Sequence, residues 1–160
     1  LGLTGVETPA ALDGDAETLA RLDAVRRAAG TAASLDPVPT GIPKVGMVAP
    51  PTAFESLSGA CLGVSDMDFA ARMVSVGRPH RAVPLTAALC LGVAACIEGT
   101  LVQEASRASG GSDIRIGHPS GVALVAAEVS GSGAEARAER AVVYRTARRL
   151  MDGFVYAPKR

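Results

Sequence analysis

The chain has 160 residues, 48% of them hydrophobic and 20% charged, which favours a folded domain with a real core over a disordered chain. Its 16 Lys and Arg residues balance its 16 Asp and Glu residues. This zero net charge offers no field that would attract nucleic acid or an anionic membrane surface, so we expect neither partner.

Cysteine and histidine are too sparse for a metal site. Cys61, Cys90 and Cys96 form no CxxC pair, and His80 and His118 are the histidines that would have to join them. We therefore expect no bound metal. With so few cysteines and no charged leader visible in the sequence, we also expect a reducing, cytoplasmic setting.

The N-terminal third is predicted to form a surface helix followed by a short strand. Apolar residues recur at helical spacing over residues 15–29, with Asp13 or Asp15 available as the N-cap and Gly30 as the C-terminal stop. A β-branched run at residues 44–49 lies between proline-containing loops and predicts the strand.

Residues 66–76 alternate between polar and apolar side chains. Asp68 and Arg72 fall on one parity, and Phe69 and Met73 fall on the other. This period of two is typical of a strand that is buried on one face.

The longest uncharged run, residues 82–97, predicts a buried helix. It falls short of the roughly 20 residues that span a bilayer. Pro84 sits where a first-turn proline belongs, and the helix predicted over residues 85–97 carries no charge on any face, so a sheet must wrap it. Cys90 and Cys96, which belong to this helix, are expected to be buried packing residues and not to act as nucleophiles or bases.

The C-terminal third is predicted to complete a sheet. Residues 130–133 favour a hairpin loop, and the stretch after it is ambiguous, because its composition favours a helix while its alternation favours a strand. We interpret it as a strand. The predicted elements are strands at residues 114–116, 122–129, 134–139 and 154–156, and a helical turn at residues 147–151.

Arginine side chains gather where the predicted buried helix begins. Residues 69–97 contain Arg72, Arg78 and Arg81 and no acidic side chain. A helix N-terminus presents unpaired backbone N–H groups, so nearby guanidinium groups would make a site for a carboxylate or phosphate. Solvated loop arginines would explain the same pattern equally well.

The run Gly-His-Pro-Ser-Gly at residues 117–121 predicts a tight turn between two strands. Its glycines permit close approach of a ligand to the backbone, and Ser120 is able to donate a hydrogen bond. Gly, Pro and Ser also dominate ordinary turns, so this string by itself favours a plain turn.

Four short strings in a fixed order span nearly the whole chain. They are Leu-Gly-Leu-Thr-Gly-Val-Glu-Thr-Pro at 1–9, Ile-Pro-Lys-Val-Gly-Met-Val-Ala-Pro-Pro at 42–51, Gly-Arg-Pro-His-Arg-Ala-Val-Pro-Leu-Thr at 77–86 and Gly-His-Pro-Ser-Gly at 117–121. Together they resemble the PrpF family. Its members include 2-methylaconitate cis-trans isomerase, 4-oxalomesaconate tautomerase and 3-methylitaconate isomerase, and they share the two-domain fold of diaminopimelate epimerase.

The resemblance implies an α+β fold, with a curved and mostly antiparallel sheet wrapped around a central apolar helix. Residues 1–160 would form one domain similar to the C-terminal half of a two-domain isomerase, and Leu1 reads as the interior of a longer protein. The acid–base Lys and Cys of the family are thought to lie in the N-terminal domain. We therefore expect no catalytic residue in this chain, no cofactor, and a partner that is the N-terminal domain or another copy of the chain.

The resemblance also implies a binding site for a small unsaturated polycarboxylate. The first turn of the predicted buried helix lacks the cysteine that diaminopimelate epimerases carry there, which argues against a diamino acid. A non-catalytic remnant and an unrelated ligand-binding module stay open as alternatives. The residues expected to line the substrate side of the cleft are Arg78, His80, Arg81, Thr86, His118, Ser120 and Gly121.

Overall fold

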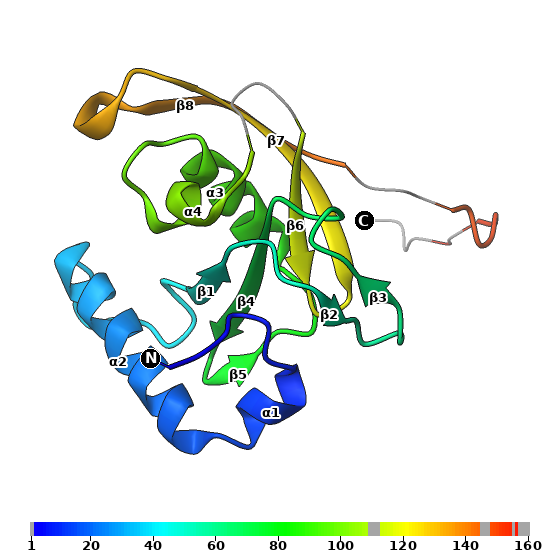
Figure 1. Ribbon diagram of the computed structural model, residues 1–160, viewed down its shortest axis with the longest axis horizontal. Helices are drawn as coiled ribbons and strands as arrows, with labels where there is room; N and C mark the ends of the chain where they lie inside the picture. Colours follow the sequence, from blue (N-terminus) through cyan, green and yellow to red (C-terminus); the bar gives the residue numbers. More distant parts are fainter. Residues whose placement is uncertain (1, 109–112, 145–147, 155, 157–160) are drawn as a thin grey trace.

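A curled sheet surrounds one side of a central helix in the computed structural model, which describes residues 2–108, 113–144, 148–154 and 156 (Figure 1). Its strands lie in the order β1 (Val45–Ala49), β4 (Phe69–Ser75), β6 (Ile114–His118), β7 (Gly121–Ser130) and β8 (Arg137–Val143), and β5 (Arg78–Pro79) also pairs with β4. β4 and β6 are parallel, and the other neighbours are antiparallel. The α+β fold expected from the resemblance is confirmed.

The helices lie on opposite faces of this sheet. Those that come first along the chain, α1 (Pro9–Asp13) and α2 (Ala16–Ala32), cover one face of β1 and β4, whereas α3 (Leu85–Ala95) and α4 (Leu101–Ala105) lie on the other (Figure 1). None of the helices in the described part of the chain is long and apolar enough to cross a membrane. Two short segments complete the fold: a hairpin of β2 (Phe54–Glu55) and β3 (Cys61–Leu62), and the 3-10 turn η1 (Gly133–Glu135).

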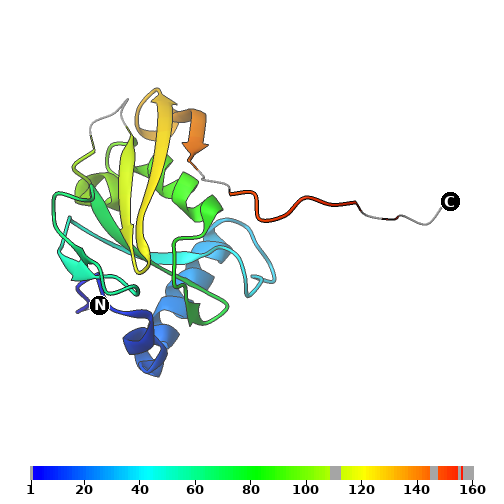
Figure 2. The same cartoon turned by 90° about the vertical axis from the view of Figure 1, so that its right-hand side faces the viewer.

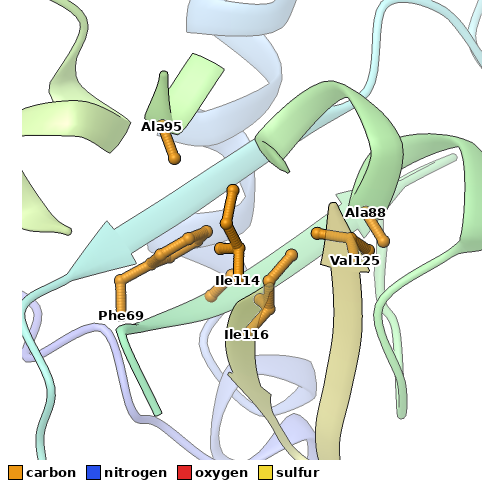
Figure 3. Close-up of a cluster of buried hydrophobic side chains, with 7 residues drawn as sticks. Phe69, Ala88, Ala95, Ile114, Ile116 and Val125 are labelled. Carbon is orange, nitrogen blue, oxygen red and sulfur yellow. The ribbon is translucent and has the colours of Figure 1, made fainter. Parts of the chain in front are cut away.

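The main core lies between α3 and the strands β4, β6 and β7. Figure 3 shows strand side chains directed toward two small residues of α3, Ala88 and Ala95. Small residues allow the helix to approach the sheet closely, and a Cβ added at Gly92 would lie 2.8 Å from Val125 Cγ2. The buried cluster consists of Phe69, Ala71, Ala88, Ala95, Ile114, Ile116 and Val125.

The predicted surface helix is confirmed as α2, but its predicted end is wrong. The carboxylate of Asp15 caps the helix by accepting a hydrogen bond from the backbone N–H of Thr18 at 2.9 Å. The helix continues past Gly30, because this glycine serves packing instead of termination. A Cβ at Gly30 would lie 2.5 Å from Val38 Cγ1, so its absence lets the following loop close over the helix.

The strand predicted at residues 66–76 is present as β4, but it is buried on both faces. Its polar parity is covered by the N-terminal segment. Arg72, only 2% exposed, donates hydrogen bonds to the carbonyl oxygens of Glu7 and Val6 at 2.8 and 3.2 Å. Its guanidinium also lies 4.5 Å from the ring centre of Phe54, and burial lowers the pKa of Arg72 to about 10.

The uncharged helix is confirmed as α3, but the sheet does not enclose all of it. Cys90 was expected to be buried but is exposed, because the sheet leaves one face of α3 uncovered between its two edge strands, β1 and β8. Cys96 follows the last residue of α3 and is half-buried, and burial raises the pKa of its thiol.

The predicted C-terminal elements differ most from the structure. β8 begins at Arg137, three residues later than predicted, since η1 takes up the first residues after the hairpin loop. Described residues 148–151 form no helical turn, and Phe154 and Tyr156 lie outside any strand with their side chains 99% exposed. Figure 2 shows this segment, in red, leading away from the sheet. Ala147 and Val155 lie outside the described residues.

Candidate functional site

The chain doubles back so that the residues before α3 lie next to the turn after β6. β5 pairs with the end of β4, with Ser75 opposite Arg78, and leads the chain back toward α3. The turn after β6 begins at His118. A hydrogen bond joins the two segments, because Ser120 Oγ donates to the carbonyl oxygen of Arg81 at 2.5 Å. The fold thus unites two strings that are 39 residues apart in the sequence.

The first turn of α3 has unpaired backbone donors. Pro84 is the N-cap residue, and it offers no side-chain hydrogen bond to the turn. Among the residues that the structure describes, no acceptor is paired with the N–H groups of Leu85, Thr86 or Ala87. These donors and the partial positive charge of the helix end suit a carboxylate or a phosphate.

His118 is buried at the end of β6, where only 9% of its surface is exposed. Its Nδ1 accepts a hydrogen bond from the backbone N–H of Ser120 at 3.2 Å. Burial and then the positive charge of Arg72 lower the pKa of His118 from its usual value of about 6.5. The imidazole is therefore neutral at pH 7.

A cavity of about 450 Å³ lies between the start of α3 and the strands β6, β7 and β8. Its volume suits a small organic molecule. Its side chains are apolar apart from His118 and Tyr144, and the Tyr144 hydroxyl donates a hydrogen bond to Asp113 at 2.9 Å. The lining residues are Ala82, Val83, Leu85, Ala88, His118, Val122, Ala123, Leu124, Val143 and Tyr144.

Thr86 and His80 do not line the cavity that His118 lines. Thr86 lines a second hollow, of about 500 Å³, which also includes Lys44 and Cys90 and is otherwise apolar. Burial and then the charge of Lys44 lower the pKa of His80. The Nε2 atom of His80 is buried and has no hydrogen-bond partner within the described part of the chain.

The other predicted site residues are Arg78, Arg81 and Gly121. One guanidinium nitrogen of Arg78 lies 3.7 Å from a carboxylate oxygen of Asp13, so this side chain turns toward α1 and is 81% exposed. Arg81 is exposed at the entrance to α3. Gly121 pairs with His118 across the turn at a φ of 136°, a backbone conformation that favours glycine. The predicted residues therefore surround the start of α3 without forming one cluster.

Comparison with known proteins agrees with this fold. The family described as PrpF protein matches residues 1–158. The chain belongs to the PrpF family. A crystal structure of methylitaconate-delta-isomerase superposes with a TM-score of 0.79 at 32% sequence identity, over 96% of this chain and 41% of that one.

Named relatives of this PrpF chain are isomerases. The 2-methyl-aconitate isomerase of Shewanella oneidensis is 36% identical over 99% of the chain and 42% of its own length. The 3-methylitaconate isomerase of Eubacterium barkeri is 33% identical, and the (4E)-oxalomesaconate Delta-isomerase of Novosphingobium sp. (strain KA1) is 32% identical. They cover 99% and 98% of the chain, which in turn spans 43% and 40% of their lengths.

Sequence reasoning about this PrpF chain missed Lys44 and Tyr144. Lys44 lies within a string that carries the family resemblance, so the string itself held a signal, but no helix-start pattern pointed to it. Tyr144 follows β8 in a stretch with no motif, and it reaches the cavity only because β8 pairs with β7. Within the described residues, no three His, Cys, Asp or Glu side chains come together as metal ligands would.

Proposed function

We propose that this chain is the substrate-binding half of an isomerase that moves a proton, and with it a carbon–carbon double bond, within a small unsaturated di- or tricarboxylic acid. 2-Methylaconitate and 4-oxalomesaconate are examples of such acids. The observation that carries the proposal is the 450 Å³ cavity at the uncapped start of α3, in a PrpF chain whose relatives are named isomerases.

The start of α3 would hold the carboxylates of the substrate. Free N–H groups in the first turn and the exposed guanidinium of Arg81 both attract negative charge. Thr86 adds a hydroxyl on one side of the helix, and His118 adds a ring nitrogen on the other. Residues 69–97 contain no carboxylate that would recognise an α-ammonium group, which favours a polycarboxylate over a diamino acid.

These donors also suit the charge that forms during the reaction. Removing a proton from a carbon conjugated to carboxylates creates a dienolate, in which negative charge spreads over several oxygen atoms. Donors that already face those oxygens stabilise this charge without having to reorient. The start of α3 provides fixed backbone donors of this kind.

We place the acid–base groups outside this chain, in an N-terminal domain or in another copy that completes the cleft. Burial and Arg72 lower the pKa of His118, which makes its neutral imidazole a weak base, and the hydrogen bond to Asp113 raises the pKa of Tyr144, which keeps the proton on its hydroxyl. Neither ionisable side chain of the cavity is therefore suited to take up a proton from carbon. The chain also spans 40–43% of its named relatives. A pair of side chains that exchanges the proton would need no cofactor, and free thiols such as Cys90 fit a cytoplasmic setting.

The test is to assay the 160-residue chain alone and joined to the part of the Shewanella oneidensis relative that it does not match. Ultraviolet absorbance follows the shifting double bond of 2-methylaconitate, 4-oxalomesaconate or 3-methylitaconate. We expect turnover by the joined protein and none by the chain alone. Robust turnover by the chain alone would show that its own residues supply the acid and the base.

Arg81→Ala in the joined protein tests where the carboxylates bind. Calorimetry with trans-aconitate should show weaker binding by this variant than by the unmodified protein. Arg27→Ala is the matched control, because Arg27 is also exposed but lies on α2, on the opposite face of the sheet. A joined protein that binds trans-aconitate yet turns over none of the three acids would favour the alternative, a non-catalytic fragment that retains the binding site.

A further inference from the structure

The hydrogen bond from Ser120 to His118 determines which ring nitrogen carries the proton. The backbone N–H of Ser120 donates to Nδ1 of His118 at 3.2 Å. A donor needs a lone pair to point at, so Nδ1 must be unprotonated. The neutral ring then carries its proton on Nε2, whereas an imidazolium ring would place two N–H groups face to face.

The surroundings of the ring also oppose a second proton. Burial disfavours the charged form of His118, and the positive charge of Arg72 disfavours it further. Arg72 is itself held in the adjacent strand β4 by hydrogen bonds to the N-terminal segment. The positive charge therefore keeps its position when the ring binds a ligand.

Three separate contacts fix the turn that carries His118. Ser120 Oγ donates to the carbonyl oxygen of Arg81 at 2.5 Å, which ties the turn to the segment before α3. The backbone N–H of Leu57 donates to the carbonyl oxygen of Pro119 at 2.7 Å, which ties the turn to the β2–β3 hairpin. His118 also pairs with Gly121 at the end of the β6–β7 ladder. These contacts hold the backbone on both sides of the ring in place.

We propose that His118 binds the ligand as a neutral hydrogen-bond donor, with Nε2–H directed to a carboxylate or enolate oxygen in the cavity at the start of α3, and that Ser120 positions this ring. His118 lines that cavity, and its Nε2 has no hydrogen-bond partner among the described residues. The enolate part rests on the proposed function, whereas the assignment of the proton to Nε2 does not.

This arrangement separates charge stabilisation from proton transfer. The Nε2–H of a neutral imidazole is a far weaker acid than an imidazolium ion, so it donates a hydrogen bond without giving up its proton. His118 would therefore stabilise negative charge on the ligand while the proton moves elsewhere. Ser120, expected from the family resemblance to line the substrate side of the cleft, donates a hydrogen bond from its hydroxyl to Arg81 and one from its backbone N–H to His118.

Nitrogen NMR of the 160-residue chain reads the tautomer directly, since the sequence contains two histidines and His80→Gln identifies the signals of His118. At pH 7 we expect an unprotonated Nδ1 and a protonated Nε2. Adding tricarballylate, a saturated tricarboxylate, should shift the Nε2–H signal. An imidazolium ring or an Nδ1–H tautomer would overturn the proposal, and so would an Nε2–H signal that saturating tricarballylate leaves unchanged.

Two pairs of variants separate donation and positioning from simple structural support. The amide nitrogen of glutamine reaches the place of Nε2 and that of asparagine the place of Nδ1, so His118→Gln should retain tricarballylate affinity while His118→Asn loses about 10-fold or more. Ser120→Ala should weaken binding and broaden the Nε2–H signal, and Ser120→Thr should restore both. Equal affinities within each pair would refute the assigned roles. An inactive joined protein with the expected NMR result would refute the isomerase function alone.

Discussion

Asp68 provides the best-defined test of what holds the sheet together. The residue is 7% exposed, and its carboxylate accepts three hydrogen bonds from Arg115: from the backbone N–H at 2.8 Å, from Nε at 3.3 Å and from a terminal guanidinium nitrogen at 2.7 Å. These contacts tie the start of β4 to β6, the strand that ends at His118. Asp68→Asn keeps the shape of the side chain but removes its charge and replaces one acceptor oxygen with a donor.

The size of the effect follows from the two kinds of contact that are lost. Hydrogen bonds to charged groups contribute about 1.5–3 kcal/mol, whereas exposed ion pairs contribute about 0–1 kcal/mol. The Arg115 side chain is 43% exposed, so water screens its half of the pair. We therefore expect Asp68→Asn to lower the free energy of unfolding by about 1–3 kcal/mol, which corresponds to about 2–12 °C in Tm.

The effect should depend on pH in one direction. Burial alone would raise the pKa of Asp68, but the hydrogen bonds and the charge of Arg115 outweigh burial and hold this pKa below its usual value. A carboxyl whose pKa is lowered by folding stabilises the protein above its unfolded-state pKa of about 3.9, and this contribution is lost as the pH falls through the folded-state pKa. The gap between wild type and Asp68→Asn should therefore be full at pH 7 and shrink below about pH 4.

Urea unfolding at pH 7 and pH 3, followed by circular dichroism, measures this gap. Asp152→Asn is the matched control, because its pair with Arg149 is longer, at 3.4 Å, and its side chain is 85% exposed. We expect no measurable change in the control. Equal stability of wild type and Asp68→Asn at pH 7, or a gap that widens on acidification, would refute the reasoning.

Three further predictions concern packing and reactivity. Gly5→Ala should lower the free energy of unfolding by about 1–3 kcal/mol, because Gly5 has a φ of 80° and the added Cβ would lie 2.5 Å from the Cβ of Ala49. An unchanged urea unfolding curve would contradict this prediction. Phe69→Ala should lower the free energy of unfolding by about 3–5 kcal/mol, measured in the same way, since the side chain is fully buried. A decrease below about 1 kcal/mol would show that the surrounding side chains close the cavity left by the substitution. Iodoacetamide followed by peptide mapping should modify exposed Cys90 faster than half-buried Cys96, whose thiol pKa is raised, and equal rates would argue against the exposed face of α3.

Local signals in the sequence predicted the elements whose causes are local. The Asp15 cap, the β-branched run of β1 and the uncharged stretch of α3 each depend on a few neighbouring residues, and the structure has all three. The family was predicted from four strings in order, and the match over residues 1–158 confirms it. Such features are accessible without knowledge of the fold.

The errors arose where distant segments decide the outcome. The alternation in β4 predicts one solvent-exposed face, but the N-terminal segment covers that face and supplies carbonyl acceptors to Arg72. Glycine is typical of helix C-terminal ends, but Gly30 lies inside the helix and allows close contact with Val38. The exposure of Cys90 depends on where the sheet edges end, which no local pattern encodes.

The candidate site was predicted as a list of residues but not as an arrangement. The spacing of Arg81 and Ser120 does not show that one would accept a hydrogen bond from the other, because that contact needs β5 to fold back along β4. The direction of the Arg78 side chain depends on Asp13 in α1 in the same way.

β4 separates two hydrophobic clusters that lie on its opposite faces. Leu12 and Leu22 of α1 and α2 pack with Val74 on one face, while Phe69 belongs to the cluster around α3 on the other. The first cluster is the smaller, so the layer formed by α1 and α2 is the one expected to open by itself in amide hydrogen exchange. Since the start of α3 rests on the larger cluster, a ligand bound there would slow exchange in α3 and β6 while leaving the opening of α1 and α2 almost unchanged.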